Sequence, residues 1–239
     1  MGSELSGKKV LVIGGSRYLG EAIARRAADA GAAVVVAARD AERASAVASE
    51  LPRGSAIRLD LTDEADIAAA AAELGTVDHI VITASAHHNA PVSELDYPSM
   101  VGAFDAKVFG PLLVAKHFAP LLPPTGSIVL FSGIAAWKPS PPYTIMGVSN
   151  GAVEFLAAHL AVELAPVRVN AISPGIVDSG TWDALGADTK QGLLEGAAAA
   201  NLVGRAGTAD DIAEAALWLL TAGFVSGETI HVEGGARHA

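Results

Sequence analysis

The sequence predicts an α/β fold: a doubly wound parallel sheet of about seven strands with helices on both faces. Short β-branched runs alternate along the chain with longer alanine-rich segments whose apolar residues recur at helical spacing. The strand-like runs are apolar on both faces, which is typical of strands covered on both sides of a sheet. With 239 residues, 51% of them hydrophobic and 18% charged, the chain has the size and composition of one large globular domain.

The expected elements follow one another mostly as strand, helix, strand. Strands are expected at Lys9–Ile13, Ala33–Ala37, Ala56–Leu59, His79–Ile82, Ser127–Phe131, Arg168–Ile172 and Thr229–Val232. Helices are expected at Leu19–Ala30, Ala41–Glu50, Glu64–Leu74, Tyr97–Leu121, Thr144–Leu164 and Asp210–Thr221. Single helices between strands require parallel pairing, so the predicted architecture is Rossmann-like. No linker or internal repeat is evident, and residues 1–239 are expected to form one domain.

Charge and missing residue types exclude several classes of function. The 16 Lys and Arg against 26 Asp and Glu give a net charge of −10, which argues against a nucleic-acid or anionic-membrane partner. Without cysteine there is no disulfide, thiolate metal site or cysteine nucleophile. The histidines have no partners at ligand spacing, so no metal site is predicted. The polar N-terminus and the absence of an uncharged apolar run of 18 residues predict a soluble, cytoplasmic protein.

A glycine-rich turn joins the first expected strand to the first expected helix. Such a turn lets backbone N–H groups and a helix N-terminus approach a pyrophosphate, which predicts a dinucleotide site. Tyr18 stands where a middle glycine is expected, and a tight connection without a ligand is the alternative. The residues expected to bind the cofactor here are Gly14, Ser16, Arg17, Tyr18, Leu19 and Gly20.

The end of the second strand favours NADP(H) over NAD(H). An acidic side chain at this place binds the ribose 2′-hydroxyl of NAD, whereas an arginine pairs with a 2′-phosphate. The sequence offers Arg39 and no carboxylate at this position, with Arg17 as a second guanidinium. The alternative is that Arg39 is a solvated surface charge beside Asp40 and Glu42.

Several motifs in order make the whole chain resemble the short-chain dehydrogenase/reductase family. They are the glycine-rich turn, Asp60-Leu61, Asn170–Gly175, Gly204–Gly207 and Val225–Gly235. The resemblance implies a single NAD(P)-binding domain and a homotetramer or homodimer. It places Asp60 and Leu61 by the adenine, Thr83, Ala84 and Ser85 by the ribose and nicotinamide, and Pro174, Gly175, Ile176 and Val177 by the carboxamide.

The same resemblance shows that the usual catalytic residues are replaced. Flanking matches set the register of the comparison. The position that usually holds Tyr is Met146, and the usual Lys is Asn150. The usual Ser is Gly133, with Ser132 beside it, and the usual Asn of the preceding helix is Lys107.

Lysine and asparagine are therefore exchanged between two positions that share one polar pocket in the family fold. We predict that Lys107 inherits the electrostatic role and that Asn150 inherits the hydrogen bonds to the nicotinamide ribose. The alternative is that Lys107 snorkels to solvent from its helix and the pocket is inactive.

A proton donor is still needed, because hydride transfer builds negative charge on the acceptor atom. Tyr143 lies seven residues before Asn150, about 20° from alignment on a helix that includes both, which resembles the enoyl-reductase branch of the family. The alternative is a loop tyrosine that packs on the substrate lid.

Ser132 is a further candidate, either to hydrogen-bond the acceptor oxygen or to cap the backbone at the strand end. His87 and His88 are either acids near neutral pH or ordinary loop residues. Residues 178–202, with Trp182, Leu185, Leu193 and Leu194, form the expected lid over a small-molecule substrate, and Trp137 either faces that lid or is core.

The leading function predicted is an NADPH-dependent reductase of a carbonyl, an imine or amide-type group, or an activated C=C bond. Two other functions remain open: a catalytically silent NADP(H)-binding sensor or structural protein, and a non-redox isomerase or cyclase on the same scaffold.

Overall fold

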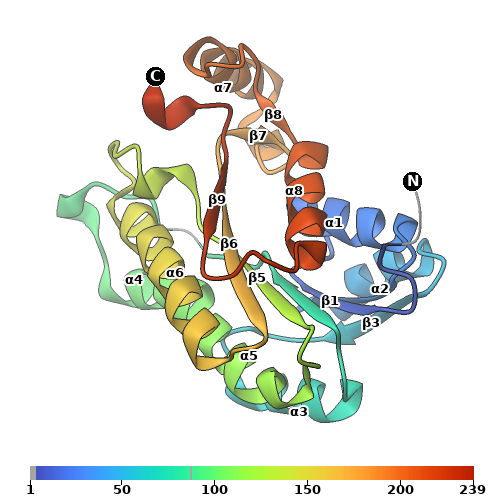
Figure 1. Ribbon diagram of the computed structural model, residues 1–239. Helices are drawn as coiled ribbons and strands as arrows, with labels where there is room; N and C mark the ends of the chain where they lie inside the picture. The colour runs from blue at the N-terminus through green and yellow to red at the C-terminus, as the bar shows by residue number, and fades with distance from the viewer. Residues whose placement is uncertain (1–3, 87) are drawn as a thin grey trace.

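The structure, a computed structural model, describes residues 4–86 and 88–239. Its main sheet has seven parallel strands in the order β3-β2-β1-β4-β5-β6-β9, so the chain reverses its direction of winding between β1 and β4 (Figure 1). This is the predicted doubly wound, Rossmann-like sheet, in which ligands collect beyond the carboxyl ends of the strands. The strands are β1 Lys9–Ile13, β2 Ala33–Ala38, β3 Gly54–Arg58, β4 His79–Ile82, β5 Ser127–Phe131, β6 Arg168–Pro174 and β9 Thr229–Val232.

Helices cover both faces of the sheet, as the apolar strands require. They are α1 Tyr18–Asp29, α2 Ala41–Ser49, α3 Glu64–Leu74, α4 Tyr97–Phe104, α5 Gly110–Phe118, α6 Thr144–Glu163, α7 Ala187–Ala200 and α8 Ala209–Thr221. A small second sheet pairs β7 Val177–Asp178 with β8 Gly207–Thr208, beside α7 and away from the main sheet (Figure 1). Neither α7 nor this small sheet is predicted by the sequence.

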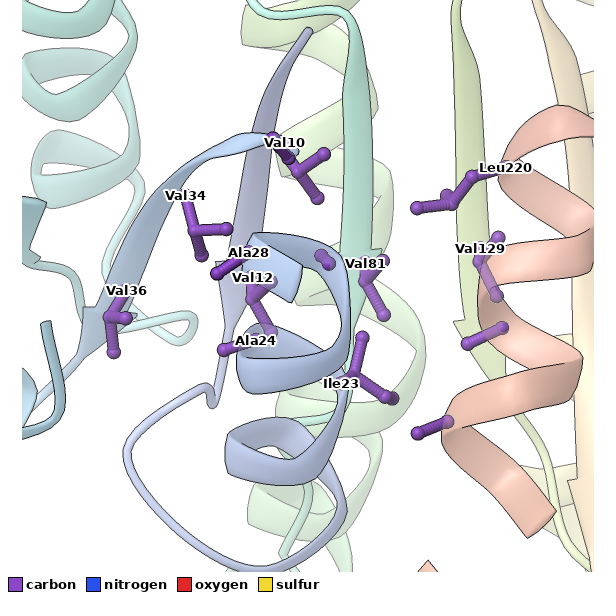
Figure 2. Packing of buried hydrophobic residues seen from close by; sticks show 14 of the residues in the cluster. Val10, Val12, Ile23, Ala24, Ala28, Val34, Val36, Val81, Val129 and Leu220 are labelled. Carbon is purple, nitrogen blue, oxygen red and sulfur yellow. The ribbon is translucent and has the colours of Figure 1, made fainter. Parts of the chain in front are cut away.

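Successive side chains of β1 point to opposite faces of the sheet and pack in two separate cores. Val10 and Val12 belong to one core with residues of α1 and α8, and Figure 2 shows Val12 next to Ala24 of α1. Leu11 and Ile13 belong to the opposite core, against α3, α5 and α6. A strand buried on both faces has no polar side, which explains why its sequence does not alternate.

The expected helix at Tyr97–Leu121 differs from the structure. A π-helical turn, Asp105–Phe109, separates α4 from α5, and a 3₁₀ turn ends the run at Leu121. Such turns inside a helix insert an extra residue and often occur at functional sites. Gly110, just after the turn, allows close packing, because a Cβ there would lie 2.6 Å from the carbonyl oxygen of Leu61.

Helix α6 is long and apolar enough, at 20 residues and a mean hydropathy of 1.4, to pass a length-and-composition test for a membrane span. Its buried residues Val153, Ala157 and Leu160 pack in the core with α5 and the sheet. A core helix of a globular protein passes the same test, so the helix is weak evidence for a membrane.

Candidate active site

The glycine-rich turn packs directly on the end of β4. Gly14 has φ +86°, and a Cβ there would lie 2.6 Å from the backbone nitrogen of Ala84. At Gly20 a Cβ would collide with the carbonyl oxygen of Gly14 and lie 2.6 Å from Thr83 Oγ1. Both positions therefore need glycine. They bring four predicted cofactor residues, Gly14, Gly20, Thr83 and Ala84, to one place at the sheet edge.

Tyr18 occupies the left-handed region of backbone space, with φ +54°, at the start of α1. A non-glycine residue pays roughly 1 kcal/mol for this conformation. The Arg17 guanidinium lies 5.2 Å from the centre of the Tyr18 ring, a cation–π contact. The turn thus keeps the conformation for which the missing glycine is suited, and it places Arg17 and Tyr18 together beside the predicted pyrophosphate site.

Arg39 follows β2 at the same edge and is exposed. Within the part of the chain that the structure describes, its guanidinium makes no hydrogen bond or ion pair, so it is free to pair with a phosphate. It lies close enough to Asp60 to affect it. Burial raises the pKa of the Asp60 carboxyl, but hydrogen bonds from Thr62 and the charges of Arg39 and Arg58 outweigh burial and hold that pKa below its usual value.

Lys107 lies in the π turn between α4 and α5, and its side chain points into the protein. It is 9% exposed, and its Nζ donates to the carbonyl oxygen of Ser132, 3.3 Å away, at the end of β5. Burial lowers the pKa of the Lys107 amine to about 8, because a charged group loses its hydration there. The alternative in which this lysine snorkels to solvent is wrong. Its catalytic role stays a prediction.

Asn150, on α6, is 3% exposed. Its side chain lies against Gly133, the residue that follows Ser132. A Cβ on Gly133 would be 2.7 Å from Asn150 Nδ2. Its Oδ1 is sealed from solvent and has no hydrogen-bond partner in the described chain. Leaving a buried polar atom unpaired costs about 1–3 kcal/mol, so such an atom in a native core calls for an explanation. The exchanged residues Lys107 and Asn150 thus both contact the Ser132–Gly133 turn.

The Ser132 hydroxyl is hydrogen-bonded within the protein. It lies 2.8 Å from Glu154 Oε1 and 3.0 Å from the carbonyl oxygen of Asn150, and both of these are acceptors. Since the hydroxyl has one proton, donation to a substrate oxygen would require breaking these contacts. The structure therefore corrects the expected acceptor-binding role: Ser132 ties β5 to α6.

Glu154 is a residue of this site that the sequence analysis missed. Its Oε1 also accepts a hydrogen bond of 2.7 Å from Trp137 Nε1. Trp137 is half exposed, and its ring makes a T-shaped contact with His231, so the expectation that it is core is wrong. The spacing Ser132–Glu154 gives no local signal, because strand and helix packing brings the two together.

Tyr143 is the N-cap residue of α6 and not part of the helix itself. Its carbonyl oxygen accepts from the backbone nitrogen of Gly147, so the first helical bond includes it. The side chain is 40% exposed, and its hydroxyl makes no hydrogen bond within the described residues. A free hydroxyl at this place is compatible with proton donation, and that role stays a prediction.

The carboxyl end of β6 is held from two sides. The Gly175 nitrogen donates to the carbonyl oxygen of Val232 on β9, and the carbonyl oxygen of Ile176 accepts from Gly207. Trp182 in the lid donates its Nε1 to the carbonyl oxygen of Val177, 2.9 Å away. Hydrogen bonds therefore hold the backbone of the predicted carboxamide-binding segment in place at the same sheet edge.

The lid of residues 178–202 is mainly α7, in which Ala197 is the buried residue. Lys190 on α7 pairs with Asp178 at 2.8 Å and with Asp183 at 2.7 Å. These pairs hold the start of the lid to its helix. They are partly exposed, which limits their contribution to stability.

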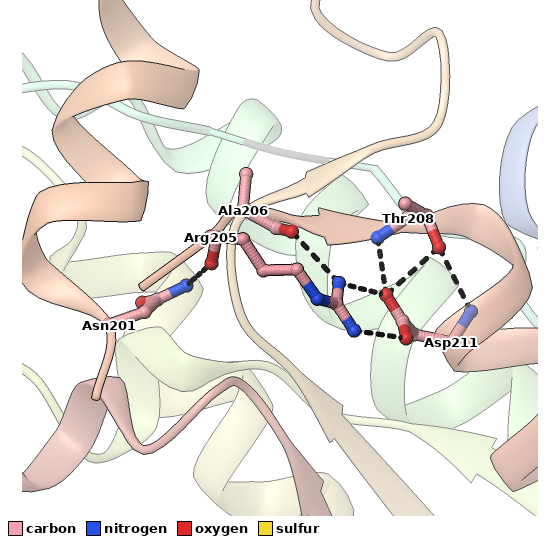
Figure 3. Close-up of polar contacts among 5 residues, drawn as sticks. All are labelled: Asn201, Arg205, Ala206, Thr208 and Asp211. Atoms are coloured by element: carbon pink, nitrogen blue, oxygen red, sulfur yellow. Dashed lines mark hydrogen bonds and ion pairs between the residues drawn. The ribbon is translucent and has the colours of Figure 1, made fainter. Parts of the chain in front are cut away.

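The far end of the lid is tied to α8. Figure 3 shows Arg205 bound to both carboxylate oxygens of Asp211, each at 2.7 Å, with Asn201 reaching back to the carbonyl oxygen of Arg205. Asp211 and Thr208 also form a capping box at the start of α8. The Arg205 hydrogen bonds hold the pKa of the Asp211 carboxyl well below its usual range.

Of the two histidines after β4, His87 lies outside the described residues. His88 Nε2 lies 3.6 Å from Asp96 Oδ2, at the start of α4. Residues 4–86 and 88–239 contain no group of three or more His, Asp or Glu side chains that would hold a metal ion.

Comparisons with known proteins identify relatives of the whole chain. A family model described as enoyl-(acyl carrier protein) reductase matches residues 14–237. A short-chain dehydrogenase/reductase from Acremonium is 32% identical over 98% of this chain and 96% of its own length. Galactitol 2-dehydrogenase from Agrobacterium fabrum is 30% identical over 97% of this chain and 98% of its own.

The chain belongs to the short-chain dehydrogenase/reductase family. Among solved structures, a small-chain dehydrogenase in complex with NADPH is 29% identical, with a TM-score of 0.84 over 97% of this chain and 99% of its own. The MalC reductase/Diels-Alderase from Malbranchea aurantiaca is 26% identical, with a TM-score of 0.92 over 99% of each chain. Relatives named as dehydrogenases or reductases support oxidoreductase activity for this family member.

Proposed function

We propose that this short-chain dehydrogenase/reductase is a cytoplasmic NADP(H)-dependent reductase of a small organic molecule. The group reduced is a carbonyl, an imine or amide-type group, or an activated C=C bond. The observation that carries the proposal is the buried Lys107 amine, which donates to the Ser132 carbonyl at the carboxyl end of β5. Burying a cation destabilises the fold. A buried lysine at the sheet edge where ligands bind is therefore a candidate functional residue.

The cofactor preference rests on Arg39 and Arg17. Both guanidinium groups lie at the sheet edge without an ion pair among the described residues, and neither Ala38 nor Arg39 at the end of β2 offers a carboxylate. These features fit a 2′-phosphate, with Asp60 and Leu61 beside the adenine and Pro174–Val177 beside the carboxamide. When bound, NADPH supplies the hydride. The structural relative in complex with NADPH supports this choice.

Lys107 supplies positive charge where negative charge develops. With a pKa of about 8, its amine is mostly protonated at pH 7. In a site with little water, this charge stabilises an anionic acceptor atom strongly. Tyr143, whose hydroxyl is free, is the proposed proton donor.

The test is oxidation of NADPH, followed at 340 nm, across ketones, cyclic imines and enones. We expect turnover that falls at least a hundredfold in Lys107→Ala and stays unchanged in Lys116→Ala, an exposed lysine on the next helix. Tight NADPH binding without turnover on any substrate would favour the catalytically silent sensor.

A non-redox isomerase or cyclase is the second candidate. The similarity to a reductase/Diels-Alderase, at a TM-score of 0.92, is the observation in its favour. Product formation without net NADPH consumption would support it over the reductase.

We also propose that the protein is a homodimer or homotetramer assembled through α6. Val148, Phe155 and Val162 are spaced by seven residues on one face of this helix, and the last two are 74% and 82% exposed. A second copy offers the same apolar stripe, so an isologous contact buries both. Light scattering after gel filtration should give a multiple of 24.1 kDa for the wild type and a smaller mass for Phe155→Asp.

A further inference from the structure

The side chain of Asn150 fills the space that a side chain at position 133 would need. A Cβ on Gly133 would lie 2.7 Å from Asn150 Nδ2 and 3.4 Å from its Cγ. The backbone of Gly133 is extended, with φ 170°, which any residue adopts. Glycine is therefore required here by the neighbouring amide, not by the backbone.

Position 133 lies where a bound substrate would meet the protein. The glycine-rich turn after β1 contacts Ala84 after β4, and β5 is the next strand along the sheet. A dinucleotide that starts at Gly14 and runs along this edge therefore reaches the end of β5 with its distal part. Gly133, the second residue after β5, lies at this end of the strand.

The side-chain amide of Asn150 is also a polar group next to Gly133 without a hydrogen-bond partner in the described part of the chain. No described residue hydrogen-bonds the amide, whereas the neighbouring Ser132 hydroxyl is held by Glu154. An asparagine is two bonds shorter than a lysine, so its amide stops beside Gly133 and does not extend as far toward a ribose. Its Oδ1 is sealed from solvent, which leaves the Nδ2 donor as the useful end.

We propose that Asn150 is a catalytic residue whose side-chain N–H donates a hydrogen bond to the acceptor oxygen or nitrogen of the substrate. It does so from the place that the side chain of residue 133 would take. This rests on the proposed reductase function and gives Asn150 a role at the acceptor atom instead of at the ribose. Lys107, which donates to the carbonyl oxygen of Ser132, supplies the charge, and Asn150 supplies the directed donor.

The test is a set of variants at positions 133 and 150, with Gly151→Ala as the matched glycine control, since a Cβ there meets nothing within 4 Å. We expect Asn150→Ala to lower kcat/KM about a hundredfold, as the loss of one such donor does. Gly133→Ala should lower it at least tenfold, because the new methyl group displaces the amide. The double variant should be no worse than Asn150→Ala alone, since the methyl group then has nothing to displace.

A rescue variant keeps the proposal testable whatever the single variants do to folding. Gly133→Ser with Asn150→Ala places a hydroxyl donor in the vacated space, and we expect about tenfold recovery over Asn150→Ala. A second readout needs no turnover: Gly133→Ala should lower the Tm of the cofactor-free protein in the wild-type background but not in the Asn150→Ala background. The Kd for NADPH, from its fluorescence, should stay within about threefold throughout.

The outcomes separate this proposal from the one on which it rests. If the wild type reduces a substrate but Gly133→Ala and Asn150→Ala keep full kcat/KM, the role of Asn150 is refuted and the reductase stands. If the variants instead weaken NADPH binding with kcat unchanged, Asn150 serves the ribose and the proposal is again refuted. If the wild type oxidises no NADPH with any substrate, the reductase function is refuted, and the role of Asn150 with it.

Discussion

Replacing Lys107 by methionine tests the cost of burying its charge. Burial lowers the pKa of the amine from 10.5 to about 8, a difference of about 2.5 units, or about 3 kcal/mol at 1.36 kcal/mol per unit. Methionine keeps most of the side-chain length and removes the charge. We therefore expect Lys107→Met to raise the free energy of unfolding at pH 7 by up to about 3 kcal/mol while abolishing turnover.

The pH dependence makes this prediction specific. Between pH 8 and pH 10.5 the unfolded chain binds more protons at this residue than the folded one, so the stability of the wild type rises with pH there. The destabilisation is complete below pH 8 and is relieved as the folded amine loses its proton. The advantage of Lys107→Met should thus shrink from about 3 kcal/mol at pH 7 to about 1 kcal/mol at pH 9.5.

Urea unfolding at pH 7.0 and pH 9.5 measures both quantities, provided that the slope against urea stays the same. Lys116→Met is the control, because this exposed lysine should show no such change between the two pH values. A Lys107→Met protein with the same stability difference at both pH values would refute the buried charge and the argument built on it.

Three further predictions concern the cofactor, the proton donor and acid stability. Arg39→Ala should weaken NADPH binding about 10- to 100-fold and NADH binding little, measured by titration, with Arg43→Ala as control; equal losses would remove the 2′-phosphate contact. Tyr143→Phe should slow single-turnover reduction at least tenfold without changing Tm, and an unchanged rate would exclude this hydroxyl as donor. His79 is buried against Ser127, and burial lowers the pKa of its imidazole to about 4. Stability should therefore fall by up to about 3 kcal/mol as pH drops from 6.5 to 4, and this loss should be absent in His79→Asn.

The layout of the sheet was predictable from the sequence, because a strand buried on both faces must be apolar throughout. The expected strand Lys9–Ile13 is β1 as observed, and Ser127–Phe131 is β5. The glycine-rich turn was also predictable, because glycines between a strand and a helix are a local sequence pattern, although the close contacts at Gly14 and Gly20 include Ala84 and Thr83 after β4. Each of these predictions came from a local sequence pattern, even where a distant residue makes the contact in the structure.

The active site was decided by packing between distant segments. Local spacing predicts one helix through Lys107, but the π turn and the contact with Ser132 depend on how α4 and α5 meet β5. Ser132 is an obvious candidate in the sequence until α6 brings Glu154 to its hydroxyl.

The same holds for Gly133 and Asn150, which are 17 positions apart and meet only when strand and helix pack. The sequence by itself determined which chemical groups reach the carboxyl edge of the sheet, because hydrophobic periodicity places each strand end there. Only the tertiary structure decided which of those groups are free to meet a ligand, because hydrogen bonds and steric contacts between elements commit some of them and leave others unpaired.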